Sequence, residues 1–428
     1  MNVLLLGSGG REHTLAWKMA QSPLLEQLFI APGNAGTLLN GTNVDLKLDD
    51  FQSIKQFVLD MNIGLIVVGP EQPLVDGLFD FFKNDKQTSE IGIIGMSKAA
   101  AQLEGSKDFA KAFMKKYNVP TADYNTFTAE TLEEGIRFLE HLESPYVLKA
   151  NGLAAGKGVV ILEDIEEAKT SLREMLLENK FGDAGSKVVI EEFLSGIELS
   201  VFVLTDGEDY VILPEAKDYK RIGEGDTGLN TGGMGSVSPV PFADEEFMNK
   251  VEQKIIIPTI KGIKNEGFDY KGFVFIGLMN IAGEPYVIEY NVRLGDPETE
   301  SVVPRIKSDL LKIFSQLTKQ QLSEVTIEID SDYAVSVMLV SGGYPQAYAK
   351  GKRIEGLQKI KDALVFHAGT LLEDNGDVIT NGGRVLAVTA KANTLPIAMK
   401  KAYEQLANIE FQGAYFRSDL GKDLLAYK

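Results

Sequence analysis

The sequence predicts a multidomain protein of the α/β and α+β classes that begins with an open parallel sheet. The chain has 428 residues, and at roughly 100–200 residues per domain this length indicates about three domains. Residues 1–100 alternate short apolar strand patterns with helical patterns, as parallel sheets covered by helices do. Longer strand patterns follow residue 187. We therefore expect domains at residues 1–101, 102–325 and 326–428.

The first domain is expected to bind a substrate at one edge of its sheet. Apolar runs predict strands at residues 3–6, 27–30, 64–68 and 91–94, and helical spacing predicts helices at residues 11–21, 51–61 and 74–82. Ligands bind such sheets beyond the carboxyl ends of the strands. One long helix, predicted at residues 97–116, leads into the second domain.

The second and third domains mix longer strands with helices. Strands are predicted at residues 187–192, 198–204, 210–213, 273–281, 286–290, 333–340, 364–367 and 384–389, with a helix near residues 395–408. Residues 217–241 are rich in Gly, Thr, Ser and Asp and are predicted to form a long loop. Loops of that length inside a compact domain are usually functional.

Composition excludes several classes of function. The formal charge is −18 with a pI near 4.8, so a nucleic-acid partner is not expected. The sequence has no cysteine and three histidines, which excludes disulfides and thiolate sites and argues against a multi-histidine metal site. Because no apolar run approaches the roughly 20 residues of a membrane span and no signal peptide is recognised, we expect a cytoplasmic protein without a membrane partner.

The strand pattern at residues 286–290 runs into a candidate metal site. Side chains alternate along a strand, so Glu289 and Asn291 point the same way, and Arg293 follows on that face. Carboxylate and amide oxygens suit Mg²⁺, which often shares its ligands with phosphates. A guanidinium beside them suits an anionic substrate or a developing phosphoryl charge. The alternative is an edge strand with a solvated polar face.

A glycine-rich turn at residues 7–12 joins the first strand to the first helix. Gly9 and Gly10 would let the backbone approach an anion at the helix N-terminus. The dinucleotide pattern requires glycine where this chain has Glu12, so the turn indicates generic anion binding or no ligand. A second turn at residues 69–73 could bring Glu71 close to it, where an acid might meet sugar hydroxyls or an amine.

A Gly/Ala loop at residues 150–158 lies between two apolar runs. Its glycines, Gly152, Gly156 and Gly158, surround Lys157 in a spacing that differs from a P-loop, and a strand follows. We interpret the loop as a hairpin tip that closes over phosphates, with Lys149 at the strand end. A solvated loop lysine is the alternative for Lys157.

Two further stretches suit a nucleotide and a small zwitterion. Residues 191–194 end a strand with apolar side chains that suit an adenine pocket, and Glu198 could meet ribose hydroxyls. An ordinary buried strand with a polar exit is the alternative. In the long loop, Asp218 precedes the glycines, hydroxyls and charges of residues 226–236, which suit a carboxylate and an ammonium. A disordered surface loop is the alternative there.

The order of these motifs closely resembles the phosphoribosylamine–glycine ligase family, the glycinamide ribonucleotide synthetases of the ATP-grasp superfamily. The motifs that carry the resemblance span essentially the whole chain: GSGGREH at 7–13, GPEQPLVDG at 69–77, LEGSK at 103–107, GLAAGKGV at 152–159, EEFL at 191–194, DTGLNTGGMG at 226–235, NVRLGDPE at 291–298 and NGGRV at 381–385. Many members have Asp, His, Phe, Pro and Pro where this chain has Asn151, Tyr219, Leu294, Met96 and Leu229.

The resemblance implies an N-terminal pre-ATP-grasp domain, an ATP-grasp core with a mobile lid at about residues 120–190, and a C-terminal mixed β/α domain. It implies that ATP, glycine and 5-phosphoribosylamine give glycinamide ribonucleotide, ADP and phosphate in purine synthesis. The implied ATP ligands are Lys107, Lys149, Gly152, Gly156, Lys157, Gly158, Glu191, Glu192, Phe193, Leu194 and Glu198. The implied substrate ligands are Gly9, Gly10, Glu71, Asp218, Gly233 and Arg293, and the implied Mg²⁺ or Mn²⁺ ligands are Glu289 and Asn291.

Chemistry of this kind needs no side-chain nucleophile. Attack of the glycine carboxylate on the γ-phosphate would give glycyl phosphate, and Arg293, Lys149 and Asp218 are the expected catalytic residues. We expect a monomer, with at most weak association with other enzymes of the pathway. Three alternatives stay open at this point: a sister ligase with another acid substrate, a non-catalytic ATP-binding module and a dinucleotide-dependent oxidoreductase.

Overall fold

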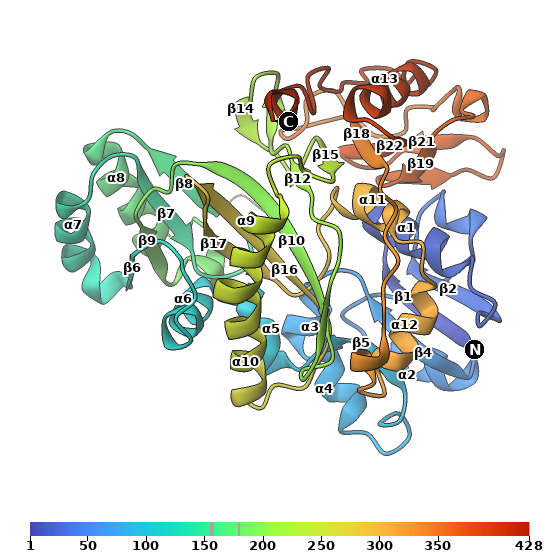
Figure 1. Cartoon of the computed structure of the whole chain (residues 1–428), viewed down its shortest axis with the longest axis horizontal. Coiled ribbons are helices and arrows are strands. Elements are labelled where there is room, and N and C mark those ends of the chain that lie inside the picture. Colours follow the sequence, from blue (N-terminus) through green and yellow to red (C-terminus); the bar gives the residue numbers. More distant parts are fainter. Residues whose placement is uncertain (155–157, 179, 428) are drawn as a thin grey trace.

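The computed structural model describes residues 1–154, 158–178 and 180–427. Figure 1 shows the N-terminal sheet, a central sheet, a lobe that projects to one side and a C-terminal sheet packed above the N-terminal one. Gly156 and Lys157 of the predicted phosphate loop lie outside the described residues. No helix in the described ranges is long and apolar enough to cross a membrane.

The N-terminal sheet is parallel, as predicted. Its strands run in the order β5-β4-β1-β2-β3, with bounds Gly92–Met96, Ile63–Val68, Asn2–Gly7, Gln27–Pro32 and Thr42–Asn43. Along β1, Leu4 and Leu6 belong to one hydrophobic core and Val3 and Leu5 to another. Because side chains alternate along a strand, this arrangement means that both faces of the sheet are covered.

The central sheet continues the N-terminal one without a break. Strand β16 (Tyr270–Ile281) pairs antiparallel with β5 and with β10 (Ile197–Thr205), while β11 (Tyr210–Ile212) and β17 (Glu284–Asn291) extend the sheet to nine strands. Hydrogen bonds therefore cross the boundary that we place at residues 101 and 102. The domain boundaries stay predictions.

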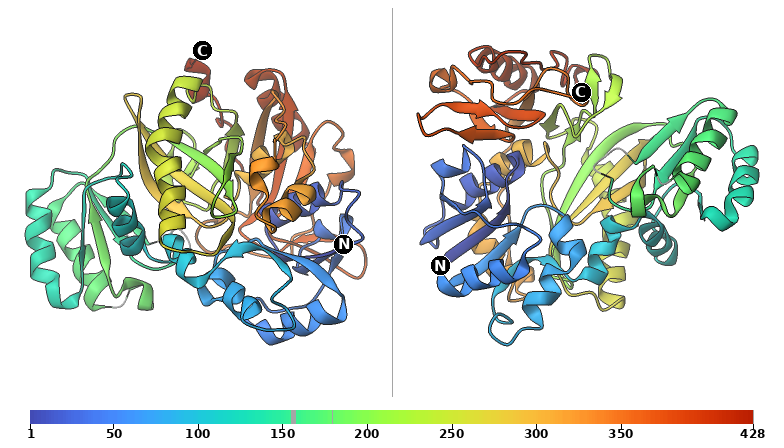
Figure 2. Two further views of the ribbon diagram at one scale, coloured as in Figure 1. Left: turned by 60° about the horizontal axis from the view of Figure 1, so that its bottom comes forward. Right: turned by 180° about the vertical axis from the view of Figure 1, so that it is seen from behind.

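A separate lobe contains the predicted lid. Its four antiparallel strands run in the order β6-β9-β7-β8, with bounds Tyr124–Phe127, Val188–Glu191, Tyr146–Ala150 and Val159–Leu162. Helices α7 (Leu132–His141) and α8 (Ile165–Leu177) pack on this sheet around their own hydrophobic core. Figure 2 shows the lobe standing away from the rest of the molecule.

Two predicted helices are each broken in two. The helix predicted at residues 74–82 is α3 (Gln72–Asp76) and α4 (Leu78–Lys83), because Gly77 between them has a φ of +100°. The helix predicted at residues 97–116 is α5 (Lys98–Gly105) and α6 (Lys107–Lys116). Ser106 is extended there, and its side chain accepts a hydrogen bond from Phe109 N, which starts the second helix.

The segment at residues 217–241, predicted to be a loop, contains four short strands. Two of them, β12 (Lys217–Asp218) and β15 (Gly235–Ser238), join the C-terminal sheet in the order β12-β15-β18-β22-β19. The other three strands of that sheet are Tyr333–Val340, Arg384–Ala392 and Leu364–His367. The prediction of a long loop was wrong because the strands are short and because the segment joins its sheet through β15, whose partner β18 lies about 100 residues away.

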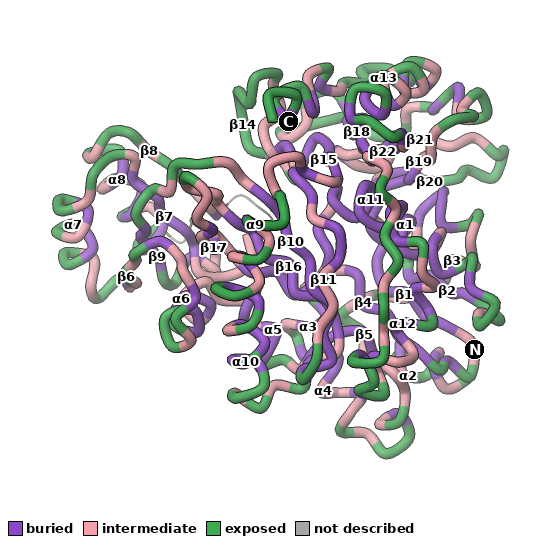
Figure 3. Tube along the Cα trace, viewed as in Figure 1, coloured by how far each residue is buried: buried purple, intermediate pink, exposed green. Residues whose placement is uncertain are grey.

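The remaining elements cover these sheets. Their bounds are α1 (Gly10–Met19), α2 (Phe51–Asp60), β13 (Arg221–Gly223), β14 (Thr227–Asn230), α9 (Glu245–Val251), α10 (Ile257–Asn265), α11 (Thr299–Val302), α12 (Leu310–Leu317), β20 (Thr370–Leu372), β21 (Val378–Thr380) and α13 (Leu395–Leu406). Figure 3 shows that the buried residues follow the central and C-terminal sheets, whereas the outer turns of the lid lobe and the tip near β14 are exposed.

Candidate active site

Strand β17 ends at a network of charged residues around Arg293. The guanidinium donates hydrogen bonds to Asn291 Oδ1 at 3.2 Å and to Glu104 Oε1 at 2.9 Å, and its Nε donates to Glu71 Oε2 at 3.2 Å. Glu71 comes from the turn after β4, and Glu104 comes from α5. The structure thus brings predicted residues from the first and second domains to one guanidinium.

Burial and charge set the protonation of this network. Burial raises the pKa of the Glu104 carboxyl to about 7, although Arg293 opposes the shift. Burial would also raise the pKa of Glu71, but Arg293 and Arg11 outweigh it and hold that pKa below its usual range. Glu104 and Glu71 outweigh burial at Arg293 and keep the guanidinium charged.

Sequence reasoning assigned no role to Glu104. Its other carboxylate oxygen accepts a hydrogen bond from Val292 N at 2.7 Å, so Glu104 holds both the backbone and the side chain at the exit of β17. The available signal was an acid on a helix face that is otherwise apolar, within the LEGSK motif.

A second charged group lies where the lid strands meet the core. Lys149 Nζ lies 2.9 Å and Lys111 Nζ lies 3.1 Å from the same oxygen of Glu191. All three side chains are buried, and burial lowers the pKa of Lys111 to about 8 despite Glu191. Lys111 was not predicted as a site residue. The Glu191 carboxylate is thus already paired, and Lys149 lies beside it rather than in open solvent.

The root of the phosphate loop is attached to α6. Lys107 Nζ donates a hydrogen bond to Gly152 O at 3.1 Å, and burial together with Lys149 lowers the pKa of Lys107, while Glu289 opposes the shift. Asn151 Oδ1 accepts hydrogen bonds from Asp108 N at 2.9 Å and from Ser106 Oγ at 3.0 Å. Asn151 therefore caps α6 as Ser106 does.

The residues predicted to surround adenine begin at the end of β9, an inner strand of the lid sheet. Gly158 O accepts a hydrogen bond from Ala150 N at 2.8 Å and closes the described part of the β7–β8 hairpin. The Glu192 carboxylate accepts from Asp123 N at 3.0 Å. The Phe193 side chain is 40% exposed and lies next to Leu194, so an apolar surface is available there.

Asp218 and Lys220 add two more charged residues to the candidate site. Lys220 Nζ lies 2.7 Å from Glu198 Oε2, and Lys220 lowers the pKa of that carboxyl. Burial raises the pKa of Asp218, which Lys220 opposes and Glu198 and Glu289 reinforce. Glu289 also acts on Lys107, so one carboxylate influences charged groups at the root of the phosphate loop and in the loop at residues 217–235.

Gly233 lies between β17's exit and the C-terminal sheet. Its φ is +118°, and a Cβ there would overlap the Pro297 ring, so both the backbone conformation and the lack of space require glycine. Arg384, from the NGGRV motif, donates to Gly232 O and to Asp296 O at 2.6 Å each, and its Nη2 lies 3.0 Å from Asp296 Oδ1. The sequence analysis quoted that motif but assigned Arg384 no role.

The first glycine turn faces the chain's own carboxylates. Gly9 N donates to Glu12 Oε2 at 2.6 Å, and Arg11 N donates to Asp296 Oδ2 at 3.4 Å. A Cβ at Gly10 would overlap the carboxyl of Glu300, which is fully buried. Glu12 thus occupies the place where a dinucleotide motif has glycine and its bound pyrophosphate, which argues against the oxidoreductase alternative.

Two side chains at the end of β17, Glu289 and Asn291, could supply oxygen ligands to a divalent cation. Glu289 makes no ion pair within the described residues, and Asn291 Oδ1 has one donor, Arg293. No group of three His, Asp or Glu side chains that could hold a metal was found in the described ranges. A Mg²⁺ here would take its other ligands from phosphates and water, which is its usual arrangement, so Glu289 and Asn291 fit the ion.

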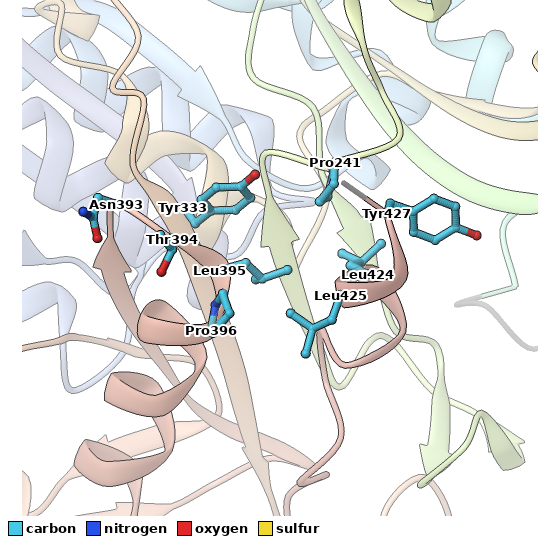
Figure 4. A pocket seen from close by; sticks show the side chains of 9 residues that line it. All are labelled: Pro241, Tyr333, Asn393, Thr394, Leu395, Pro396, Leu424, Leu425 and Tyr427. Atoms are coloured by element: carbon cyan, nitrogen blue, oxygen red, sulfur yellow. The ribbon is translucent and has the colours of Figure 1, made fainter.

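The groove in Figure 4 is not part of this site. It has a volume of about 420 Å³ and lies between the start of α13 and the C-terminal end of the chain. Figure 4 labels its lining residues, none of which is charged: Pro241, Tyr333, Asn393, Thr394, Leu395, Pro396, Leu424, Leu425 and Tyr427. None of the described residues that we predict to bind ATP, substrate or metal lines this groove.

Comparison with known proteins gives the same family from sequence and from structure. Profiles of phosphoribosylglycinamide synthetase match residues 1–104 (N domain), 105–299 (ATP-grasp domain) and 334–423 (C domain). The chain is 46% identical to phosphoribosylamine–glycine ligase of Yersinia pestis over 100% of this chain and 99% of that one. It is 46% identical to a bifunctional purine biosynthetic protein of Pichia angusta over 98% of this chain and 53% of that one.

A solved structure agrees with these relatives. Phosphoribosylamine–glycine ligase of Thermotoga maritima superposes with a TM-score of 0.84 at 37% identity, over 98% of this chain and 100% of that one. The family accounts for the three-part architecture and for ATP-dependent ligation by an ATP-grasp core. The chain belongs to the phosphoribosylamine–glycine ligase family, the ATP-grasp ligases of purine biosynthesis.

Proposed function

We propose that this protein joins glycine to 5-phosphoribosylamine with the conversion of ATP to ADP and phosphate, giving glycinamide ribonucleotide. The observation that carries the proposal is the position of Arg293. Its guanidinium donates to Glu71 of the turn after β4, to Glu104 of α5 and to Asn291 Oδ1 at the end of β17. A charged fork at that junction suits a reaction in which a phosphoryl group, a carboxylate and an amine must meet.

The proposed chemistry has two steps. A glycine carboxylate oxygen attacks the γ-phosphorus, the bond between the β–γ bridging oxygen and that phosphorus breaks, and ADP leaves. The nitrogen of phosphoribosylamine then attacks the acyl carbon of glycyl phosphate, and the carbon–oxygen bond to phosphate breaks. The proton released from the amine goes to the departing phosphate or to water. Each step displaces a good leaving group, so no enzyme nucleophile is required.

In this proposal the charged side chains neutralise phosphoryl oxygens and orient the acid. Lys107 and Lys149 lie at the root of the lid and face the nucleotide phosphates with residues 152–158, while Arg293 faces the transferred group. Glu289 and Asn291 hold Mg²⁺ or Mn²⁺, which supplies charge neutralisation at the phosphates when bound. Asp218 pairs with the glycine ammonium, and Gly233 offers backbone to its carboxylate.

Exclusion of water is the task of the lid. An acyl phosphate hydrolyses in water, so the hairpin β7–β8 should close over it. Residues 191–194 hold adenine and Glu198 the ribose, and Gly9, Gly10 and Glu71 face the phosphoribosylamine. We further propose a monomer that works in the cytoplasm, with at most weak association with other enzymes of the pathway.

The test is release of ADP from Mg-ATP with freshly prepared phosphoribosylamine, with and without glycine. The proposal expects ADP only when both glycine and the amine are present. Alanine and bicarbonate in place of glycine are the controls for a sister ligase. ADP release with bicarbonate but not glycine would contradict the acid substrate, and tight ATP binding without any turnover would favour a non-catalytic module.

A further inference from the structure

The glycine-rich segment that precedes Gly233 forms a hairpin with little support of its own. Strands β13 and β14 pair only with each other among the described strands, and residues 224–230 are all exposed. An isolated two-stranded hairpin is at best marginally stable in water. The conformation of this hairpin must therefore depend on contacts from elsewhere.

Those contacts come from the C-terminal end of the chain. Figure 1 shows β14 beside the C-terminus, and the rear view in Figure 2 agrees. Arg417 Nη1 donates hydrogen bonds to Arg221 O at 3.1 Å and to Asp226 Oδ1 at 2.6 Å. Its Nε and Nη2 donate to the two oxygens of Asp419 at 2.8 Å and 2.7 Å. Four of the five N–H donors of the guanidinium are thus engaged, and its side chain is 1% exposed.

Residues near Arg417 also form hydrogen bonds with the same hairpin. Asp419 Oδ2 accepts a hydrogen bond from Gly225 N at 2.8 Å, and Tyr415 OH donates to Ile222 O at 3.0 Å. Ser418 Oγ donates to Glu224 Oε1 at 2.5 Å. We call Tyr415, Arg417, Ser418 and Asp419 the C-terminal clasp.

The clasp continues to the root of the loop through Tyr219. Lys217 Nζ lies 3.8 Å from the centre of the Tyr219 ring, and the guanidinium carbon of Arg417 lies 5.4 Å from it. Tyr219 OH donates to Asp423 at 2.6 Å and accepts from Gly421 N at 2.9 Å. Because side chains alternate along an extended segment, fixing Tyr219 on the C-terminal side turns the side chain of its neighbour Asp218 to the opposite side.

We propose that Arg417 is a positioning residue that sets the glycine-binding conformation of residues 217–235 from the C-terminal domain. It touches no substrate and acts through the hairpin and Tyr219. The inference rests on the proposed function, in which Asp218 and Gly233 bind glycine. Its consequence is selective: loss of the clasp should weaken glycine binding far more than ATP binding, whose proposed ligands, apart from Glu198, lie in the lid lobe, in α6 and in the segment that follows β9.

The test compares Arg417→Lys with Asp226→Asn. Lysine keeps the charge but cannot reach Arg221 O, Asp226 and Asp419 together. Because the substitution removes charge-assisted hydrogen bonds, we expect the glycine KM to rise about tenfold, with the KM of ATP and kcat within about twofold. Asp226 is 53% exposed at its side chain, so Asp226→Asn should fold normally and raise the glycine KM in the same direction.

The matched control is Arg353→Lys. Arg353 also lies in the C-terminal region, and its Nε lies 3.2 Å from Asp377 Oδ1, but it is 64% exposed and contacts neither loop. We expect no change in any KM. Hydrogen exchange provides a readout that needs no turnover. In Arg417→Lys and in Asp226→Asn, exchange should accelerate at residues 221–230 and stay unchanged in the lid.

Two results would overturn the inference. One is an unchanged glycine KM in both Arg417→Lys and Asp226→Asn. The other is an equal rise in the KM of all three substrates together with faster hydrogen exchange throughout the C-terminal sheet, because that result would mean that Arg417 has only a structural role. Failure of the proposed function is distinguishable, because wild-type ADP release would then not require glycine.

Discussion

The loop after Lys149 and the loop after Lys217 both carry clustered glycines, but the rest of the chain holds them differently. The first is tied down at its root, where Asn151 caps α6 and Lys107 reaches Gly152 O. The second is tied along its length by Arg417, Asp419, Tyr415 and Arg384. The first belongs to a lobe with its own core, whereas the second adds strands to the C-terminal sheet.

This difference separates two tasks in the proposed reaction. A loop that must open for ATP and close over an acyl phosphate benefits from few contacts outside its own lobe. A loop that must hold a ligand as small as glycine benefits from a prearranged backbone, because a small ligand has little binding energy with which to order it. The clusters of glycine look alike in sequence, but the described contacts hold the first loop at its root and the second along its length.

The largest effect should come from the group that acts on both loops. Glu289 influences Lys107 at the root of the first loop and Asp218 in the second. We expect Glu289→Gln to lower Mg-dependent kcat by about 10³-fold, because it removes the charge of a proposed metal ligand while keeping its shape. Steady-state ADP release over a range of Mg²⁺ concentrations measures this.

The control for Glu289→Gln is Glu284→Gln on the same strand. Glu284 pairs with Lys250 and Lys254 on an exposed face and should be replaceable without loss of turnover. Near-normal activity of Glu289→Gln would remove the metal assignment, and with it the argument that the two loops serve one centre.

An intermediate effect should come from the root of the first loop, at Asn151. Asn151→Ala removes both hydrogen bonds that the side chain accepts, from Asp108 N and Ser106 Oγ. Loss of a helix cap costs about 1 kcal/mol, so we expect the KM of ATP to rise about fivefold with the glycine KM unchanged. This pattern is the reverse of that expected for Arg417→Lys, and steady-state kinetics with each substrate varied in turn measures both.

Asn151→Asp is the matched variant for that prediction. It keeps both acceptor contacts and adds a negative charge at the N-terminus of α6, which the helix dipole favours, so the KM of ATP should stay near that of the wild type. If Asn151→Ala raised the glycine KM instead, the assignment of the first loop to ATP alone would be wrong.

Local patterns predicted the elements but not their partners. Alternation and apolar runs predicted the strands of the parallel sheet and the hairpin around residues 150–158, because those signals lie within a few residues of one another. Helical spacing continued through Gly77 and Ser106, and so it missed both breaks. Arg417 and Asp226 are 191 residues apart, and Glu104 and Arg293 are 189 apart. No local pattern reports such a pairing.

The site residues divide in the same way. Glu289, Asn291 and Arg293 were predicted together because one strand carries them, and the structure brings Glu71 to the same guanidinium. Glu104 and Lys111 escaped because a buried charge on a helix looks like an ordinary polar position until its partner is known. The roles of all these residues in binding stay predictions.

The smallest effect on turnover at neutral pH should come from the contacts between α1, Asn34 and β19, which involve no charged side chain. We call these contacts the histidine joint. His13 of α1 accepts a hydrogen bond from His367 N at 2.7 Å, and Asn34 Nδ2 donates to His367 O at 2.8 Å and to Ser8 O at 2.9 Å. This joint holds the turn at Gly9 against β19. Burial lowers the pKa of His13 to about 3 and that of His367 to about 4, so both rings are neutral in the folded protein.

The sign of the pH effect follows from these lowered values. A histidine in the unfolded chain binds a proton below a pKa of about 6.5, whereas these two do not until far lower pH. The stability of the joint is therefore complete above pH 6.5 and is lost as the pH falls from there toward 4. Between pH 7 and pH 5 each histidine should contribute a loss of about 2 kcal/mol.

His13→Asn isolates that contribution, because the amide oxygen can still accept from His367 N but has no proton to gain. The single tryptophan, Trp17, contacts Phe366 with ring centres 5.8 Å apart and reports on this joint by fluorescence during urea unfolding. Burial raises the pKa values of Glu104 and Glu298 to about 7, so these two groups stabilise the folded state as the pH falls. Their contribution is the same in both proteins and cancels when the two losses are compared. We expect the wild type to lose about 2 kcal/mol more than His13→Asn between pH 7 and pH 5, with turnover at pH 7.5 the same in both. Equal losses in the two proteins would mean that the histidine joint does not hold the first turn, and that the N-terminal turn is supported by Asp296 and Glu12 alone.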